Sequence, residues 1–337
     1  MCLNPSTAIG ETGFWRPGDN VNSVQGTGAA IYKPDIYKLI EKKIEELNEE
    51  LRVLSLDIHD HPEVRFEEHH AHDVLTAFME KHGFEVTPHY FLETAWMAKY
   101  THGAGGRTLG INSEMDALPA VACAVKSVME HLDISGHIVV LGTPAEEGGA
   151  GKVILHDKGA YKGMDICLMC HPAPGPASSA SLSSSLAISP LEIEYHGHTA
   201  HAALAPWEGQ NALDAAVCAY TSISMLRQQV KPTHRIHGTI RSKDWAPNII
   251  PDYAKMEWLV RAPTYEEVKA TVPRVRACLE AAGHATACRV EFDSTNPILF
   301  DLRQNKALGD EFADVFSSKY GSIDYEYGIK NASTDFV

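Results

Sequence analysis

The chain has 337 residues and a mass of 36.9 kDa, which exceeds one domain of about 150 residues and fits two. An apolar share of 44% and a charged share of 22% are typical of a globular protein, so wholesale disorder is excluded. The net charge of −15 argues against nucleic-acid or anionic-membrane binding, because both require clustered Lys and Arg. No apolar run approaches the roughly 18 residues that a membrane-spanning helix needs.

The N-terminal region predicts no packed structure. Residues 1–33 are rich in Gly, Pro, Asn, Ser and Thr and show no periodicity, which predicts a flexible tail. The first residues also lack the basic start and apolar stretch of a secretory signal. Seven scattered cysteines, an odd number, are typical of free thiols in a reducing compartment. We therefore expect a cytoplasmic protein.

Helical and strand patterns alternate along the next part of the chain. Apolar residues at three- and four-residue spacing predict amphipathic helices, and continuous apolar runs predict strands that are buried on both faces. The helices are expected at 35–57, 66–81, 122–132 and 153–158, and the strands at 84–87, 95–100, 108–113, 137–142 and 165–170. The alternation predicts an α/β layer structure.

From residue 187 the order of the predicted elements changes to β-α-β-β-α-β, which is the ferredoxin-like unit. Its strands are expected at 191–196, 234–241, 254–261 and 288–292, and its helices at 212–230 and 265–282. We predict an α+β lid domain over residues 187–298, inserted into an α/β domain formed by 34–186 and 299–337. A further helix over 303–320 is expected to return to the first domain.

Two adjacent carboxylates, Glu146 and Glu147, follow a predicted buried strand in the sequence PAEEGG. That position is the carboxyl edge of a parallel sheet, where α/β enzymes bind their ligands. Adjacent carboxylates repel each other, and a cation between them makes the arrangement favourable. One Glu can then bind metal while the other takes a proton from water. The alternative is an acidic helix N-terminus that the helix dipole stabilises.

Further candidates follow other strands. His171 ends a predicted strand at the same sheet edge as Glu147, where it can bind zinc or simply cap the strand. Its motif CLMCH suggests c-type haem attachment, but Cys167 and Cys170 point to opposite faces of a strand and are expected in the core. Asp116 can orient a metal ligand or serve as a turn acid before proline.

Two groups of histidines complete the candidates. His201 lies in the loop HGHTAHA, where it can face a cleft or simply be exposed to solvent. Five histidines between positions 59 and 72 resemble a metal-binding tract. Their uneven spacing on a predicted helix favours a surface cluster instead.

Five motifs occur in one order: EMDALP, TPAEEGGAGK, CHPAPG, GHTAHA and APNIIPDYA, preceded by HDHPEVRFEE. Over about residues 35–335 they resemble the metal-dependent amidohydrolases of peptidase family M20, in particular its Xaa-Arg or β-alanyl-lysine dipeptidases and aminobenzoyl-glutamate hydrolases. The resemblance implies a zinc-peptidase-like catalytic domain with two zinc or manganese ions, and a lid that forms a homodimer. It also implies hydrolysis of an amide bond in small-molecule dipeptides or in N-acyl or aminobenzoyl amino acids.

The resemblance implies a role for each matched residue. Glu146 matches the general base, Glu147 and His171 match metal ligands, and Asp116 matches the acid beside the metal site. His201 matches the lid histidine that enters the partner's active site and stabilises the oxyanion, and Asn248 matches a residue that helps to bind substrate.

The sequence departs from the family pattern in two places. A segment resembling GIGHACGHN, which carries two metal ligands, is absent because Pro119 runs directly into Ala120. Cys123 does not replace it, since its flanks match the helix downstream. The chain also ends at Val337, before the family's last His ligand. We therefore expect an incomplete zinc site and impaired turnover. The alternatives are an inactive relative that dimerises through its lid and a metal-free small-molecule binding module.

Overall fold

The computed structural model describes residues 35–115, 119–146, 148–242, 244–293, 297–324 and 332–336. The described residues up to Ala173 form one compact unit, and those from Pro174 to Asp335 form a second. The tail predicted for residues 1–33 lies outside the described residues. The boundaries proposed above for the catalytic and lid domains remain predictions.

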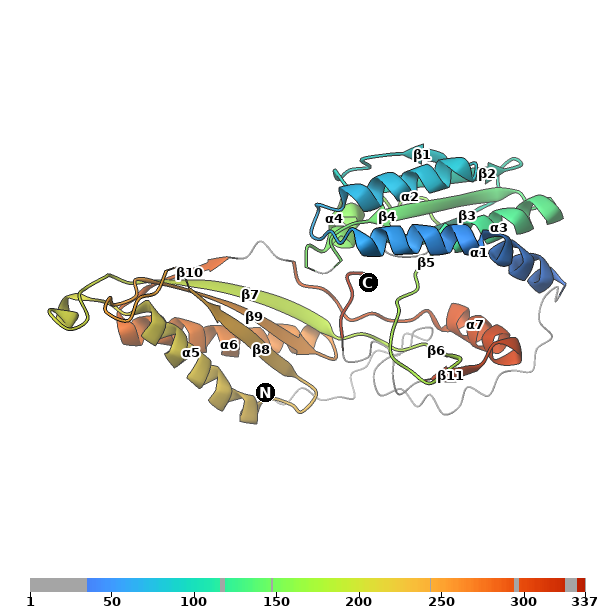
Figure 1. Ribbon diagram of the computed structural model, residues 1–337. Helices are drawn as coiled ribbons and strands as arrows, with labels where there is room; N and C mark the ends of the chain where they lie inside the picture. The colour runs from blue at the N-terminus through green and yellow to red at the C-terminus, as the bar shows by residue number, and fades with distance from the viewer. Residues whose placement is uncertain are drawn as a thin grey trace. The chain divides into compact units, whose positions relative to one another are not determined.

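A five-stranded sheet organises the first unit, with the strand order β1-β2-β4-β3-β5 (Figure 1). Its strands are β1 (Glu85–Thr87), β2 (Trp96–His102), β3 (Arg107–Glu114), β4 (Gly136–Thr143) and β5 (Ile166–Leu168). β3 pairs in parallel with β4 and with β5, whereas β1 and β2 run antiparallel to their neighbours. The carboxyl ends of β3, β4 and β5 therefore meet at one edge of the sheet.

Helices cover both faces of this sheet: α1 (Ile36–Asp60), α2 (His69–Lys81), α3 (Pro119–Leu132) and α4 (Gly151–Asp157). On one face, Ile138 of β4 packs in a core with Trp96 and with Leu47 of α1. On the other face, Leu141 packs against Leu155 of α4. Successive side chains of β4 therefore pack alternately into the two cores, as its continuous apolar sequence predicts.

The strand predicted at residues 165–170 differs from the structure. β5 spans only three residues and forms an edge of the described sheet. Ile166 and Leu168 are 41% and 43% exposed, so the strand is not buried on both faces. Cys167 is partly buried and Cys170 is exposed, which corrects their expected place in the core. An apolar run alone does not distinguish a central strand from an edge strand.

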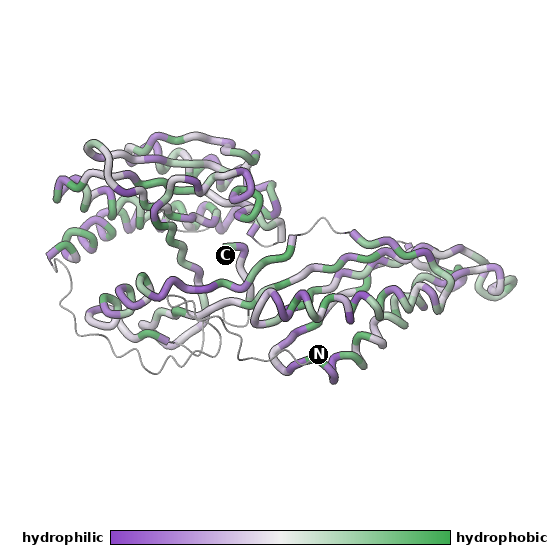
Figure 2. Tube along the Cα trace, turned by 180° about the vertical axis from the view of Figure 1, so that it is seen from behind, coloured by the Kyte–Doolittle hydropathy of each residue, from purple (hydrophilic) through white to green (hydrophobic). Residues whose placement is uncertain are grey.

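A four-stranded antiparallel sheet with the order β10-β7-β9-β8 organises the second unit. Its elements follow the chain as β7 (Ala187–His196), α5 (Ala212–Leu226), β8 (Arg235–Arg241), β9 (Tyr253–Ala262), α6 (Tyr265–Thr286) and β10 (Arg289–Asp293). This is the predicted β-α-β-β-α-β order. Buried Tyr195 and Trp258 join the sheet to Ile223 of α5 and Leu279 of α6 in one core. Hydrophobic and hydrophilic residues alternate along the long strands (Figure 2).

The remaining elements of the second unit are short. β6 (Ser179–Ser181) pairs in parallel with β11 (Ser322–Asp324), and α7 (Lys306–Lys319) corresponds to the last predicted helix. Two single turns of 3-10 helix lie at Pro206–Glu208 and Arg227–Gln229. None of the helices in the described part of the chain combines the length and the apolar character needed to cross a membrane.

Candidate active site

Three potential metal ligands meet where parallel strands end. Glu114 is the last residue of β3, Glu146 follows β4 and His171 follows β5. Their ligand atoms all lie within 4.8 Å of one another, and His171 Nε2 lies 4.0 Å from Glu146 Oε1. His171 Nδ1 lies 2.7 Å from the carbonyl oxygen of Pro172. Because a carbonyl only accepts, Nδ1 donates this hydrogen bond, which leaves Nε2 free to bind an ion.

The backbone that carries Glu146 is held in an unusual shape. Ala145 has a φ of 60°, a conformation that is costly for a residue with a side chain. Its N–H donates to Glu68 Oε1 at 2.8 Å, and Thr94 Oγ1 donates to Glu68 Oε2 at 3.3 Å. Glu68 is buried, so its hydrogen bond with the N–H of Ala145 is shielded from water. A Cβ on Gly151 would clash with the carbonyl oxygen of Pro144, so only glycine fits there.

Glu114 belongs to a buried ion pair. Lys152 Nζ, in the first turn of α4, lies 3.0 Å from Glu114 Oε1, and their side chains are 2% and 8% exposed. The lysine thus compensates one negative charge in a site with several carboxylates. Neither residue was singled out from the sequence. The available signal was position, because Glu114 ends a predicted strand and Lys152 belongs to the motif TPAEEGGAGK.

A cavity of about 500 Å³ adjoins these ligands. Its wall includes the segment between α1 and α2, with His61 and Glu63, together with Glu146 and His171. Cavities of this size hold small molecules such as dipeptides.

The three ligands fit the metal that the family resemblance implies. Carboxylate oxygen and imidazole nitrogen are ligands of both zinc and manganese, and Glu114 and His171 supply one of each. The 4.0 Å separation of Glu146 and His171 is too long for a hydrogen bond, so the Glu146 carboxylate lies beside the ion position, where it can bind the ion or take a proton from water. Two of the predicted site residues, Asp116 and Glu147, lie outside the described residues.

His201 and Asn248 lie in the second unit, where backbone contacts bring their loops together. The N–H of Ala202 donates to the carbonyl oxygen of Asn248 at 2.9 Å. His201 Nδ1 accepts hydrogen bonds from the N–H groups of Ala203 and Leu204, at 3.2 and 3.1 Å. In a neutral ring, Nε2 then carries the proton. Both His201 and Asn248 are exposed, so this N–H can serve as a donor to a ligand.

Known proteins with similar sequences cover most of this chain. Xaa-Arg dipeptidases from Mus musculus and Homo sapiens are 35% and 36% identical to it, over 92% and 87% of this chain and 78% and 74% of their own lengths. A p-aminobenzoyl-glutamate hydrolase chain from Escherichia coli is 28% identical, over 76% of this chain and 60% of its own length.

Solved structures share the fold. The aminobenzoyl-glutamate utilization protein from Klebsiella pneumoniae superimposes with a TM-score of 0.69 at 17% identity, covering 88% of each chain. A dinuclear metal-binding peptidase of the M20 family from Bacillus subtilis gives 0.58 at 18% identity, covering 89% of this chain and 85% of its own. The sequence profile of the peptidase dimerisation domain matches residues 188–287. The chain therefore belongs to the M20 family of metal-dependent peptidases and amidohydrolases.

Proposed function

We propose that this protein is a metal-dependent amidohydrolase that cleaves the amide bond of a dipeptide or of an N-acyl or aminobenzoyl amino acid. The convergence of Glu114, Glu146 and His171 within ion-binding distance at the carboxyl edge of the sheet supports this proposal. The substrate class is taken from the names of the related dipeptidases and aminobenzoyl-glutamate hydrolase. We propose zinc as the metal, with manganese as the alternative.

In this proposal, different residues bind the metal ion and transfer the proton. Glu147 and His171 hold the ion, with Glu114 as a further ligand from β3, and Asp116 orients the ligands. When bound, the zinc ion polarises the substrate carbonyl and lowers the pKa of water. Glu146 takes the proton from the attacking water onto a carboxylate oxygen and passes it to the leaving amine.

We further propose that the second unit assists the reaction. The Nε2–H of His201 suits the stabilisation of an oxyanion, since Nδ1 already accepts two backbone hydrogen bonds. Asn248, in the loop held against that of His201, would bind substrate. The match to a dimerisation domain supports a homodimer formed through this unit. The six described cysteines are free, which supports a reducing, cytoplasmic location.

The test compares Glu146→Gln with the wild type after zinc reconstitution of the full chain. Substrates are β-alanyl-lysine, a dipeptide ending in Arg, and aminobenzoyl-glutamate. We expect Glu146→Gln to lower kcat by about 100-fold or more while the zinc content is unchanged, because a base is lost. Glu80→Gln, an exposed position on α2, is the matched control and should behave like the wild type. Because the segment that carries two of the family's metal ligands is absent, we expect the turnover of the wild type to be impaired. A zinc-loaded wild type with no measurable turnover would contradict the proposal and favour an inactive relative.

A further inference from the structure

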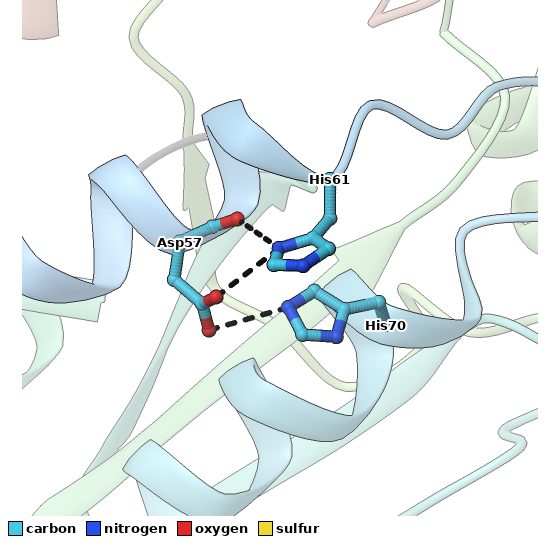
Figure 3. A group of neighbouring side chains, drawn as sticks. All are labelled: Asp57, His61 and His70. Atoms are coloured by element: carbon cyan, nitrogen blue, oxygen red, sulfur yellow. Dashed lines mark hydrogen bonds and ion pairs between the residues drawn. The ribbon is translucent and has the colours of Figure 1, made fainter.

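A second group of potential metal ligands lies where α1 ends and α2 begins (Figure 3). Asp57 Oδ2 lies 3.2 Å from His70 Nε2. His61 Nδ1 lies 3.2 Å from Asp57 Oδ1 and donates a hydrogen bond to the carbonyl oxygen of Asp57 at 2.8 Å, so its Nε2 is the ring nitrogen that can bind an ion. The two imidazole rings face the same carboxylate, with their centroids 4.2 Å apart. The three ligand atoms all lie within 4.8 Å of one another. None of the three residues belongs to the group at the carboxyl edge of the sheet.

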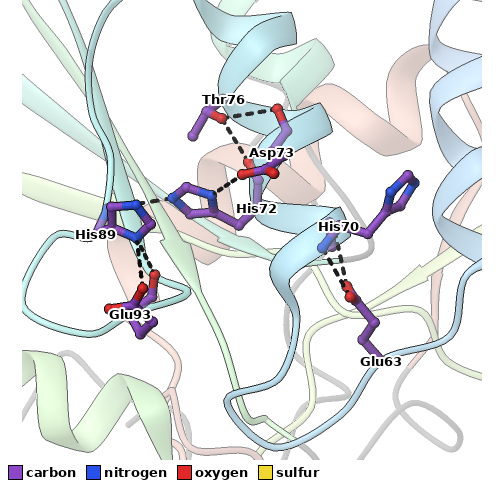
Figure 4. Close-up of polar contacts among 8 residues, drawn as sticks. Glu63, His70, His72, Asp73, Thr76, His89 and Glu93 are labelled. Atoms are coloured by element: carbon purple, nitrogen blue, oxygen red, sulfur yellow. Dashed lines mark hydrogen bonds and ion pairs between the residues drawn. The ribbon is translucent and has the colours of Figure 1, made fainter.

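Local structure fixes the position of each ligand. Asp57 lies in the last turn of α1, and His61 is the residue that follows the helix, where its side chain turns back toward Asp57. His70 is in the first turn of α2, where Glu63 accepts the N–H of His70 at 2.9 Å and that of Ala71 at 3.1 Å (Figure 4). The carboxylate of Glu63 thereby satisfies two N–H groups that a helix start leaves unpaired. The end of α1, the start of α2 and the segment between them therefore fix the relative positions of Asp57, His61 and His70.

One ring nitrogen in this group has a single charged neighbour and no well-formed hydrogen bond. His70 Nε2 is shielded from solvent, and its 3.2 Å contact with Asp57 Oδ2 does not have the geometry of a hydrogen bond, nor does any other contact that it makes among the described residues. Such atoms are rare in folded proteins and point to an ion or a bound water. His72, two residues along α2, differs: its Nδ1 lies 2.9 Å from Asp73 Oδ1, and its Nε2 accepts the N–H of His89 at 3.4 Å (Figure 4).

We propose that Asp57, His61 and His70 bind a divalent transition-metal ion, with zinc as the preferred ion. Two imidazoles and one carboxylate are a donor set that zinc accepts, with one position left open. Calcium and magnesium are disfavoured because they prefer oxygen ligands. The ion replaces the direct contacts between the carboxylate and the two rings, and it joins the end of α1 to the start of α2. Since His61 lines the cavity beside Glu146, the bound ion also fixes part of the cavity wall.

The site differs from the surface cluster that the histidine spacing favours. The chain's fold brings together only two of the five histidines between positions 59 and 72. His59 and His69 are exposed and lie beside Asp60 and Glu67 instead. This separation supplies a matched control, because His69 is adjacent to His70 on α2 but points to another partner.

The experiment isolates this site in the full chain that also carries Glu147→Gln and His171→Ala, which change the two residues proposed to hold the ion at the other site. Zinc is added, unbound metal is removed by gel filtration, and the content is measured by elemental analysis. We expect about one zinc per chain. His70→Ala should weaken zinc affinity by at least 10-fold, because loss of even an outer partner of a metal site has that effect. His69→Ala should leave the affinity unchanged.

Two further measurements keep the test decisive. Asp57→Asn replaces a partly exposed carboxylate by an amide of the same shape, and it should weaken zinc binding while the chain stays folded. Zinc should also raise the Tm of the background protein but not that of the His70→Ala variant. The proposal is overturned if the background protein retains no zinc, or if His69→Ala loses as much zinc affinity as His70→Ala.

Discussion

At the scale of single residues, Glu68 fixes the backbone that carries Glu146. Its buried carboxylate accepts the N–H of Ala145, whose positive φ costs about 1–3 kcal/mol unless the surroundings impose it. Glu68→Ala removes this acceptor, so Glu146 should lose its position. We expect kcat of the zinc-loaded enzyme to fall by about 10- to 100-fold, since small displacements of catalytic groups have effects of this size.

The control for this prediction is the conservative variant Glu68→Gln. The amide oxygen of Gln can still accept the N–H of Ala145, so most of the activity should remain. Measurement of kcat and KM for both variants separates loss of position from loss of folding. Equal activities of Glu68→Ala and the wild type would contradict a positioning role.

The buried pair of Lys152 and Glu114 supports a second prediction at this scale. Lys152→Met leaves the Glu114 carboxylate buried without its cation, which should lower the free energy of unfolding by about 3–5 kcal/mol. Adding Glu114→Gln to the same chain removes the unpaired charge and should recover much of that loss. Chemical denaturation of the metal-free proteins, followed by circular dichroism, measures both changes. A single variant as stable as the wild type would show that the pair is unimportant.

At the scale of helices and strands, the burial of His234 predicts a pH effect on the second unit. Its side chain is 6% exposed, and its Nδ1 lies 3.0 Å from Thr271 Oγ1 of α6. Burial lowers the pKa of His234, and the nearby Lys231 adds to this effect, while Glu267 opposes it. The unfolded chain therefore binds the proton more readily than the folded chain does. Stability should fall as the pH drops below about 6.5, the usual pKa of histidine.

The measurement is the free energy of unfolding at several pH values between about 5 and 7.5, a range that spans the usual histidine pKa. His234→Gln should reduce its dependence on pH, because the titrating group is gone. His284→Gln, at an exposed position on α6, is the control and should keep the wild-type slope. A His234→Gln variant with an unchanged slope would assign the effect to other groups.

Much of the fold could be predicted from periodicity, but which strand lies at the edge of the sheet could not. The run HIVVLG predicts a central strand, and Ile138 and Leu141 of β4 do pack into two different cores. The run DICLMC has a similar composition, yet Ile166 and Leu168 of β5 are exposed, because pairing partners rather than composition decide which strand lies at an edge. Patterns within one segment carry no information about the neighbouring strand.

The site shows the same limit at the scale of elements. Glu146 and His171 could be placed at one sheet edge because each follows a predicted strand. Glu114 was missed because it still belongs to its strand, and only the register of β3 beside β4 sets its side chain near Glu146. The proximity of Asp57 and His70 could not be predicted for a similar reason. The segment between α1 and α2 brings them together, and it has no periodic pattern of its own.

At the scale of the whole molecule, the two units carry different parts of the proposed function. The first unit contains the ligand group of Glu114, Glu146 and His171, the ligand group of Asp57, His61 and His70, and the cavity. The second contains His201, Asn248 and the region that matches the peptidase dimerisation domain. The proposed reaction draws on residues of both units, which is why a test of the oligomeric state belongs with it.

The last prediction is a homodimer formed through the second unit. Leu204 and Trp207 follow His201 three residues apart and are 74% and 79% exposed, and they lie within the region that matches the peptidase dimerisation domain. Neighbouring exposed apolar side chains are suited to an interaction surface. Two-fold dimers are the commonest oligomers. Light scattering should therefore give twice the chain mass of 36.9 kDa. Changing both Leu204 and Trp207 to Ser should raise the dimer dissociation constant by about 10-fold or more, since buried aromatic anchors dominate interface energies. Val53→Ser, at a 68% exposed position on α1, is the control and should leave the dimer intact. A wild-type chain that stays monomeric at high concentration would contradict the prediction.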